Sequence, residues 1–495
     1  MKKTLLSAAA LLMALTACNK EPVGGSAVDN GSVYMQFSVN MLSTRSQTDD
    51  KGDSNSNANP DTEVGLNKEN TISTVDIALV GPSSTVVAAN VTPTAANAST
   101  YVAKFDTKAL EAGKTYKVYI YANCSAPAAV DVNAVSEASV AEMTADNKFW
   151  MTNAYDAADV TLPSDLAAYT QPNTPLSLGS HTVERSMARF DYKAKNAGNV
   201  YDMGAGLSLT LTDAALINQS KAHYVFRRVT TSDTDNTPVV GGIETPNNWV
   251  IDTDWASKTK EGFNAQLEAP ANWSWTSLSS LSTDDNYDGD YKIWCYAKEN
   301  TIPGIDAQKH NVSTGVVFKA QITAGDGASD AVKTAMTAGN RIYVFNNKLY
   351  GAWSDVKTAA EAGTDATLQA AYNQAAAKIA APATEPAGAD AAAAGFTGYS
   401  PKDGKYYAYY YYWNRHNDNL DPYKMGIMEY AVVRNNVYKL CVDSISKFGH
   451  PDPTNPTDPD PDPVKPNDPD ESVNYYFTVT VKVLPWTVRI NNIEF

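Results

Sequence analysis

Alternation of apolar and polar residues along many short stretches of this chain predicts β-strands with one buried face each. The first stretch spans residues 33–41, and its apolar positions are Val33, Met35, Phe37, Val39 and Met41. Between residues 70 and 181 short strands recur, as in TVDIALV and TYKVYIYAN. Later alternating stretches are LSLTLTD, TGVVFKAQI, NRIYVFNNKLYG, GKYYAYYYYW and YAVVRNNVYKLCVDSISKFG. Many strands with few helices predict a mainly β protein built as β-sandwiches.

The C-terminal stretch, residues 473–495, repeats this alternation. Its apolar positions are Val473, Tyr475, Phe477, Val479, Val481 and Val483. The phase shifts by one at Leu484-Pro485, after which Trp486, Val488 and Ile490 carry the apolar face. Because a proline cannot donate to a β-ladder, the pattern predicts two short strands hinged at Pro485. A strand at a chain terminus either folds back on its own body or is presented to another molecule.

A proline- and aspartate-rich segment, residues 451–472, precedes this arm and reads PDPTNPTDPDPDPVKPNDPDES. It has few amide donors and cannot pack, so we expect an extended, semi-rigid spacer. Helices are expected in two places. One is VSEASVAEMTADNKFW, with Ser136 or Ser139 as the N-cap, and the other is the Ala-rich insertion between Asp355 and Ala381.

The N-terminus indicates export. Lys2 and Lys3 precede the apolar run LLSAAALLMAL, which is too short to span a membrane. Leu15-Thr16-Ala17-Cys18 resembles a bacterial lipobox, a signal that is cleaved before its cysteine so that this residue receives lipid. We therefore expect a lipid anchor on Cys18, since more than one acyl chain gives stable attachment. The alternative is an ordinary secretory signal with a chance cysteine.

A candidate processing site follows the first strand. Arg45 is followed by Ser46 and by the polar, acidic stretch TDDKGDSNSNANPD. This composition predicts an unpacked loop, in which an arginine is accessible to a trypsin-like protease. We therefore expect cleavage between Arg45 and Ser46.

Composition and charge exclude several classes of function. The formal net charge of -16 argues against a nucleic-acid partner, which requires basic patches. After Cys18 the chain has only Cys124, Cys295 and Cys441, whose wide spacing is typical neither of a disulfide framework nor of a zinc site. We expect these three to be small buried apolar residues.

Motifs for catalysis or cofactor binding are absent from the sequence. There is no HExxH, GxSxG, P-loop or Rossmann fingerprint, and the five histidines do not cluster, so we expect neither an enzyme nor a cofactor. Asp284, Asn286 and Asp288 match the first half of a calcium-binding loop, but Cys295 occupies the position of the essential glutamate. A polar turn is the better interpretation. The tyrosine run 406–412 favours a strand with two aromatic faces over a sugar-binding platform.

Three parts of the chain resemble the fimbrillin family, the shaft subunits of type V pili, and most closely the shaft subunits of minor fimbriae. The first is the lipobox together with the strand that ends in Thr44-Arg45, and the second is Val-Glu-Arg-Ser-Met-Ala-Arg at residues 183–189. The third combines Val-Arg-Asn-Asn-Val-Tyr at residues 433–438, Ser444-Ile445, the spacer, and Val-Leu-Pro-Trp at residues 483–486.

This resemblance implies two transthyretin-like β-sandwich domains. The expected organisation is a signal peptide at 1–17, a lipidated pro-segment with the first strand at 18–45, an N-terminal domain at 46–182, a C-terminal domain at 183–450, the tether at 451–472 and a donor-strand arm at 473–495. The family implies removal of the first strand by an Arg-specific protease and polymerisation by donor-strand exchange. The strand to be lost and the arm share one alternation and similar length, which supports this interpretation.

The expected partners are other copies of the chain, anchor and tip accessory fimbrial proteins, and host or bacterial surface receptors. The expected location is the outer membrane for the lipidated precursor and then a surface fimbrium that serves adhesion and biofilm formation. The alternative function is a monomeric outer-membrane lipoprotein that binds glycans. The two differ in that a polymer subunit loses residues 18–45, whereas a monomeric binder keeps its lipid.

Overall fold

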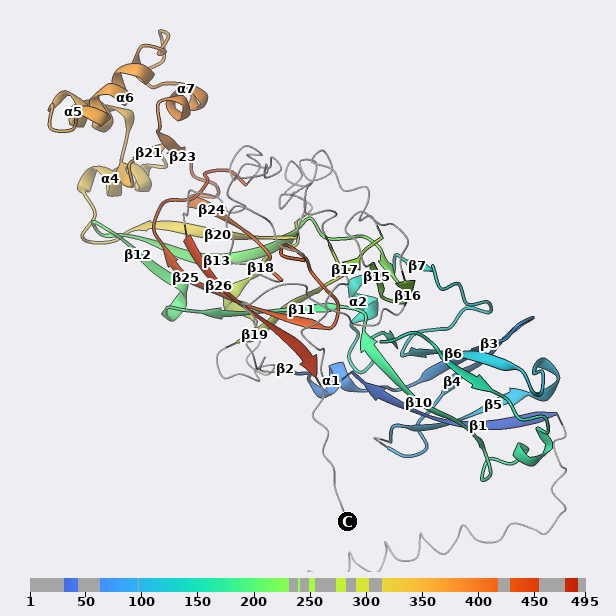
Figure 1. The fold of residues 1–495 in the computed structure, drawn as a ribbon. Coiled ribbons are helices and arrows are strands. Elements are labelled where there is room, and N and C mark those ends of the chain that lie inside the picture. Colours follow the sequence, from blue (N-terminus) through green and yellow to red (C-terminus); the bar gives the residue numbers. More distant parts are fainter. Residues whose placement is uncertain are drawn as a thin grey trace, which may run out of the picture.

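The computed structural model describes residues 31–42, 63–96, 98–230, 239–240, 249–253, 273–281, 291–301, 314–416, 428–453 and 477–487. The chain is mainly β, and its described parts follow one another along a long axis (Figure 1). A curled N-terminal sheet lies at one end, two facing sheets occupy the middle, and a helical module lies at the opposite end (Figure 1). The mainly β prediction is therefore confirmed.

The N-terminal sheet wraps around its own apolar core. In spatial order its strands are β4 (Thr85–Val91), β3 (Val75–Val80), β6 (Thr115–Ala122), β8 (Met151–Asn153), β10 (Leu176–Arg185), β1 (Ser32–Met41) and β5 (Thr100–Asp106), with β9 (Ala158–Thr161) beside β6. A bridge between Pro93 and Tyr101 brings the two outer strands towards each other and curls the sheet.

Period-two alternation predicts the inward face of this sheet correctly. Val75, Ile77 and Leu79 of β3 lie in the apolar core, as do the alternate residues of β6, namely Tyr116, Val118 and Ile120. A short helix, α2 (Val140–Met143), begins at Ser139, whose hydroxyl accepts a hydrogen bond from the Glu142 amide. The predicted N-cap at Ser139 is therefore confirmed.

Two sheets in the middle of the molecule form a β-sandwich. One contains β19 (Lys292–Ala297), β11 (Ala188–Ala194), β25 (Asn436–Ile445), β26 (Phe477–Thr487) and β2 (Glu63–Val64), in that order. The other contains β12 (Val200–Gly204), β13 (Leu207–Ile217), β20 (Gly315–Ala324) and β24 (Tyr406–Trp413), with β18 (Thr276–Ser277) beside β13. Both contribute side chains to one core, for example Phe190 and Leu440 from the first sheet and Leu209 and Phe318 from the second.

Small sheets connect these bodies. β7 (Val135–Ser136) of the N-terminal part pairs with β14 (His223–Tyr224), and β15 (Arg228–Thr230) pairs with β16 (Val239–Val240) and β17 (Trp249–Ile251). Short 3₁₀ turns lie at Thr107–Ala109, Ala167–Tyr169, Ala197–Asn199 and Leu278–Ser280. Phe226, from the segment between β14 and β15, packs against Tyr119 and Tyr121 on the outer face of the N-terminal sheet. The two parts of the chain therefore share an apolar contact.

The Ala-rich insertion is helical, as predicted, and belongs to a compact module with its own core. The module contains β21 (Ile342–Phe345), β22 (Lys348–Tyr350), α5 (Trp353–Glu361), α6 (Ala366–Ala376), α7 (Gly388–Ala393) and β23 (Thr397–Tyr399), and α4 (Asp330–Ala338) precedes it. Trp353 packs edge-on against Tyr343 and Phe396 within this core. Figure 1 shows the module at the end of the molecule farthest from the N-terminal sheet.

Two local predictions are wrong. The stretch NRIYVFNNKLYG is not one strand but a hairpin, because Asn346 and Asn347 adopt positive φ angles of 46° and 64° and turn the chain between β21 and β22. The arm is not hinged at Pro485, since β26 runs without interruption from Phe477 to Thr487. Pro485 lies opposite Asn436, the first residue of β25, so its missing N–H affects only the end of that ladder.

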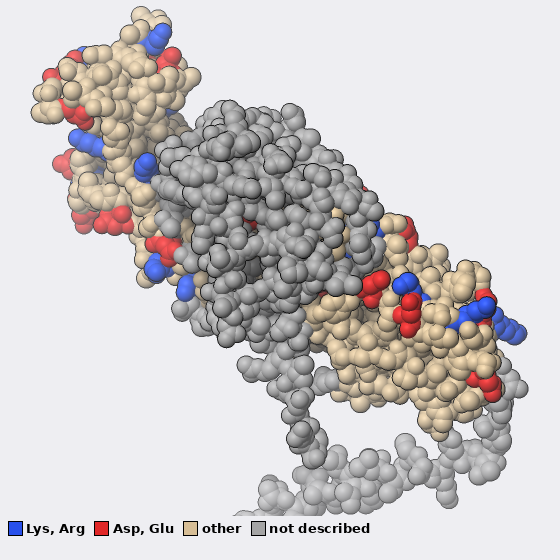
Figure 2. Space-filling view, in the orientation of Figure 1, with Lys and Arg blue, Asp and Glu red and all other residues tan. Residues whose placement is uncertain are grey.

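The tyrosine-rich strand has two aromatic faces, as predicted. Tyr406 and Tyr410 of β24 face the sandwich core, whereas Tyr407 and Tyr411 pack with Trp275 on the outer side of the sheet. The molecular surface carries both signs of charge. Figure 2 shows Lys and Arg side chains interspersed with Asp and Glu over the described part of one face.

Candidate assembly site

The strand predicted to be removed lies inside the N-terminal sheet rather than at its edge. β1 pairs in parallel with β10 and antiparallel with β5, so that Met35 lies opposite both Leu176 and Ala103. Its inward side chains are at most 3% exposed, namely Val33, Met35, Phe37 and Val39, and Met41 is half-buried against the same core. Removing β1 would therefore leave an apolar slot between two strands with unpaired backbone groups.

Phe37 is the central side chain of this slot. Its ring stacks on Tyr101 of β5 at 5.4 Å and meets His181 of β10 edge-on at 6.5 Å. Burial lowers the pKa of His181, and a hydrogen bond to the backbone of Leu178 opposes this effect. The imidazole is therefore favoured in its neutral form while β1 covers it.

The C-terminal arm is folded back on its own body. β26 pairs antiparallel with β25, from Phe477 opposite Ile445 to Pro485 opposite Asn436, and Val479 packs half-buried against the sandwich core. At its far end Trp486 and Thr487 pair with β2. Phe477, Val479, Val481, Val483 and Trp486 of the predicted donor strand thus lie in one strand, whereas Val473, Tyr475, Val488 and Ile490 fall outside the described residues.

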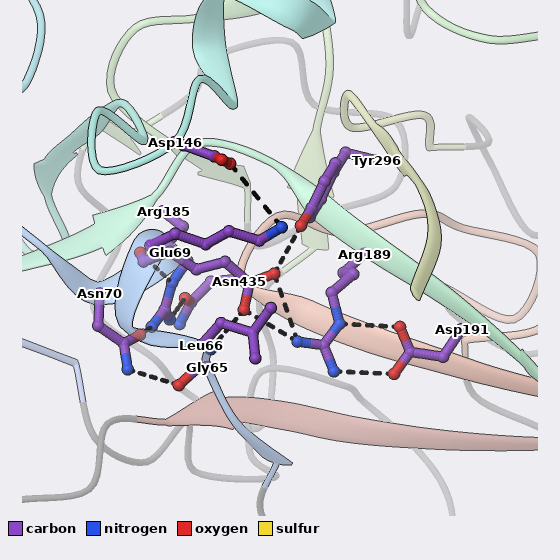
Figure 3. Close-up of polar contacts among 11 residues, drawn as sticks. Gly65, Leu66, Glu69, Asn70, Asp146, Arg185, Arg189, Asp191, Tyr296 and Asn435 are labelled. Atoms are coloured by element: carbon purple, nitrogen blue, oxygen red, sulfur yellow. Dashed lines mark hydrogen bonds and ion pairs between the residues drawn. The ribbon is translucent and has the colours of Figure 1, made fainter. Parts of the chain in front are cut away.

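A buried polar network joins the N-terminal and C-terminal parts of the chain beside the end of this arm (Figure 3). Its centre is Glu69 of α1 (Asn67–Asn70), whose side chain is fully buried. The Glu69 carboxylate accepts hydrogen bonds from Arg189 at 3.0 Å, from the Tyr296 hydroxyl at 2.6 Å and from the Leu66 amide at 2.7 Å. Arg189 also forms a bidentate pair with Asp191, with both distances 2.8 Å.

Arg185, which lies in the second of the motifs that suggested a family, connects α1 to the third. Its Nε donates to the Glu69 carbonyl at 3.3 Å, its Nη1 donates to Asn435 Oδ1 at 3.1 Å, and its Nη2 donates to the Asn70 side chain. The backbone N–H of Asn435 in turn donates to the Met187 carbonyl at 2.9 Å. Residues 183–189 and 433–438, far apart in sequence, therefore meet around α1 (Figure 3).

Further buried charges extend the junction. Arg434 pairs with Glu299 at 2.7 Å and donates to the Tyr224 carbonyl at 2.7 Å. Arg227 lies 3.4 Å from Glu184, and both side chains are fully buried. Removing one partner of a buried pair leaves an uncompensated charge, which typically costs roughly 3–5 kcal/mol. The junction is therefore a rigid connection whose parts depend on one another.

Two titratable groups report on this environment. Burial raises the pKa of the Tyr296 hydroxyl well above its ordinary value, and the neighbouring Glu69 carboxylate raises it further. Burial lowers the pKa of His223 to about 3, and the cationic Arg434 and Lys298 contribute to the same shift. Both side chains are therefore neutral around pH 7.

The junction arginines and Glu69 were not expected from the sequence. Arg185, Arg189, Arg227 and Arg434 are among the largest fully buried side chains of the described chain. Charged residues are normally exposed, so alternation alone places them on a solvent face. The available signal was that two of these arginines, Arg189 and Arg434, stand directly beside apolar strand sequence, where a charged side chain requires a buried partner.

The structure describes some of the remaining predicted site residues, and others lie outside the described ranges. Cys124, Cys295 and Cys441 are free thiols; Cys441 is buried and the other two are half-buried, and burial raises the pKa of Cys124 to about 12. Cys18, Arg45, Ser46, Asp284, Asn286 and Asp288 lie outside the described residues. Within the described ranges no three potential ligands cluster as a metal site requires. Of the helices in the described chain, none combines the length and hydropathy needed to cross a membrane.

These features define a mainly β protein with an inner N-terminal strand, a paired C-terminal arm and a rigid junction between them. Residues 404–492 match the family model described as major fimbrial subunit protein type IV, fimbrillin, C-terminal. This match confirms the fimbrillin resemblance for that part of the chain, which includes β24, β25 and β26. No curated protein matched the chain.

Solved structures give a weaker likeness. A fimbrilin from Porphyromonas gingivalis is 13% identical with a TM-score of 0.41, and the match covers 92% of this chain and 98% of that one. A tip fimbrial protein of the same species, with a C-terminal truncation, is 9% identical with a TM-score of 0.36, and the match covers 92% of this chain and 100% of that one. Both TM-scores are low, so the family assignment rests on residues 404–492.

Proposed function

We propose that this chain is a structural shaft subunit of a surface fimbrium. It is exported as a lipoprotein on Cys18, processed after Arg45, and polymerised when the C-terminal arm of one copy replaces β1 in the next. The fimbrium then serves adhesion and biofilm formation together with anchor and tip proteins. The single observation that carries the proposal is the position of β1 between β10 and β5, joined to the body by strand pairing on both sides.

The arm and the slot are matched in size. β1 has 10 residues and β26 has 11, and each belongs to a stretch of apolar residues at every second position. Burial of four or five apolar side chains of the arm in the slot stabilises the complex by on the order of 10 kcal/mol. The loss of conformational entropy when the arm becomes ordered offsets part of this gain. Strand addition also restores backbone hydrogen bonds to both neighbours of the slot.

The positions of slot and arm favour a head-to-tail polymer. The slot lies in the N-terminal sheet at one end of the molecule, whereas β26 begins at Phe477, beside Ile445, at the end that carries the helical module (Figure 1). A contact between two different surfaces that are far apart on the molecule is heterologous. It repeats as an open filament where its rotation does not close a ring.

Deleting residues 473–495 from the mature protein tests this proposal. We expect the truncated chain to remain folded and monomeric, and electron microscopy to show no fimbriae. A second variant that lacks residues 18–45 but keeps the arm should polymerise without protease, because its slot is already open. Intact fimbriae from the arm-deleted chain would refute the donor-strand assignment.

A further inference from the structure

The segment that follows β25 and begins the tether is held by hydrogen bonds at residues 446–450 and at Pro453. We call residues 446–453 the tether root. Its backbone groups are bound by two separate structures, the turn of the helical module and the strand β24. Such extensive pairing is unusual for a segment that connects a strand to a spacer, since connecting segments are generally the mobile parts of a fold.

The module contributes its hairpin turn. The Asn347 side-chain amide donates to the Ser446 carbonyl at 2.9 Å, and its oxygen accepts from the Phe448 amide at 3.2 Å. One asparagine thus pairs with the root as a neighbouring strand would. Tyr399, at the end of β23, adds a hydrogen bond from its hydroxyl to the Gly449 carbonyl, and its ring lies 6.4 Å from that of Phe448.

Strand β24 holds the other side. The Tyr410 hydroxyl donates to the Lys447 carbonyl at 3.0 Å and accepts from the Gly449 amide at 3.1 Å. His450 and Tyr409 exchange two backbone hydrogen bonds of 2.8 Å, and the Tyr411 hydroxyl donates to the Pro453 carbonyl at 2.5 Å. Gly449 fits because a Cβ atom there would clash with the Tyr409 carbonyl oxygen.

We propose that the tether root is the mechanical anchor of the subunit and that the helical module is its clasp. The inference rests on the proposed function in one respect, namely that the arm is inserted in a neighbouring copy. A tensile force along the fimbrium then reaches each subunit through its tether and acts on the body of the subunit at Pro453. The tether root, and not β25, is therefore the first part of the body to bear this force.

The clasp matters because β25 becomes vulnerable when the arm leaves. β25 lies between β11 and β26, so release of β26 turns it into an edge strand. Without the contacts that the module and β24 make with the tether root, pull at Pro453 would pass to Ile445 and peel β25 from β11 one hydrogen bond at a time. The module and β24 together therefore set the point at which release of the arm stops.

Hydrogen exchange on the full-length mature protein tests the anchor without assuming any polymer. We expect the amides of Phe448, Gly449 and His450 to be protected in the monomer. Asn347→Gly keeps the positive φ of the turn but removes the amide, and should speed exchange at Phe448 at least about ten-fold. Asn346→Gly, at the adjacent turn position, should leave it unchanged. Unprotected root amides, or equal exchange in both variants, would overturn the proposal.

A pulling experiment between the two termini of the mature chain locates the boundary. The first release should free residues 454–495, roughly 140–150 Å of extended chain, and the root should yield only at higher force. In Asn347→Gly this second event should shift to lower force. A first release that already includes residues 446–453 would contradict the anchor. If instead arm deletion leaves fimbriae intact, the donor-strand proposal fails while both measurements on the monomer still stand.

Discussion

The carboxylate of Glu69 lies 3.0 Å from the guanidinium of Arg189, and neither side chain is exposed to solvent. Glu69 belongs to α1, which follows the predicted processing site, and Arg189 belongs to β11, at the start of the second part of the chain. The pair therefore holds the N-terminal segment of the predicted mature chain against the body by a contact that does not involve β1.

Loss of this pair should destabilise the whole junction. In Glu69→Ala, Arg189 keeps Asp191 but loses its second partner, and Tyr296 loses its acceptor, so we expect the free energy of unfolding to fall by roughly 3–5 kcal/mol. Urea denaturation of the full-length protein measures this change. Lys68→Ala is the matched control on the same helix, since its partly exposed pair with Asp146 at 3.8 Å should contribute less than about 1 kcal/mol. Equal effects would show that the junction does not depend on Glu69.

The inward face of the arm should be more sensitive than its outward face. Val479→Asp places a carboxylate where Val479 packs against the sandwich core, so in the monomer it should release β26 and in the polymer it should prevent insertion. Thr480→Asp, one residue along and at a polar position of the alternating sequence, should leave both nearly unchanged. Limited proteolysis of the arm and electron microscopy report the two effects. Normal fimbriae from Val479→Asp would argue against arm insertion.

Processing should depend on Arg45 and on no nearby basic residue. Arg45→Ala should leave the precursor with β1 in place and without fimbriae, whereas Lys51→Ala should mature normally. N-terminal sequencing of mature fimbriae should begin at Ser46. A start at Cys18 would mean that β1 is retained.

The step before processing is lipidation at Cys18, and Cys18→Ala tests it. The expected result is unprocessed precursor inside the cell.

Acid should weaken the contact between the two parts of the chain. His223 of β14 is buried, and its pKa falls from 6.5 to about 3 through burial and the nearby Arg434 and Lys298. The folded state therefore binds fewer protons at His223 than the unfolded state does between these values. The free energy of unfolding should then decrease as the pH is lowered, by up to roughly 1.4 kcal/mol per pH unit.

His223→Gln should flatten this part of the curve of stability against pH. Urea denaturation between pH 4 and pH 7 compares the two proteins, and the difference between their curves isolates His223 from the other titrating groups. Parallel curves would show that His223 does not carry the effect.

The alternation of apolar and polar residues predicted the strands well. A strand with one buried face carries an apolar side chain at every second position, so the pattern follows directly from the structure. It placed Val33 and Met35 correctly, as it did Ile77 and Val118. This sequence pattern failed where the backbone conformation or hydrogen bonding of a single residue decides the local structure. Asn347 turns a predicted strand into a hairpin, and Pro485 is tolerated because it stands at the end of a ladder. Neither property is visible in hydropathy.

The junction was beyond prediction for a different reason. Whether Arg189 is exposed or buried depends on a carboxylate 120 residues earlier in the sequence, at Glu69. Pattern within one stretch cannot reveal a partner that only the tertiary fold brings near. The same holds for Asn347 and the tether root, which lie about a hundred residues apart.

In the proposed function, the inner position of β1 between β10 and β5 would also make maturation irreversible. While β1 is covalently joined to the body, it occupies the slot as an intramolecular ligand, whose effective concentration for a short connection is of millimolar order, so that an arm from outside would compete poorly. Proteolysis after Arg45, as proposed, cuts that linker, and the freed peptide dilutes into the surroundings once it leaves. Reoccupation then becomes a collision between two molecules. Growth of the proposed filament would thus run in one direction without any nucleotide or ion gradient, because one strand changes from a tethered to a diffusing ligand.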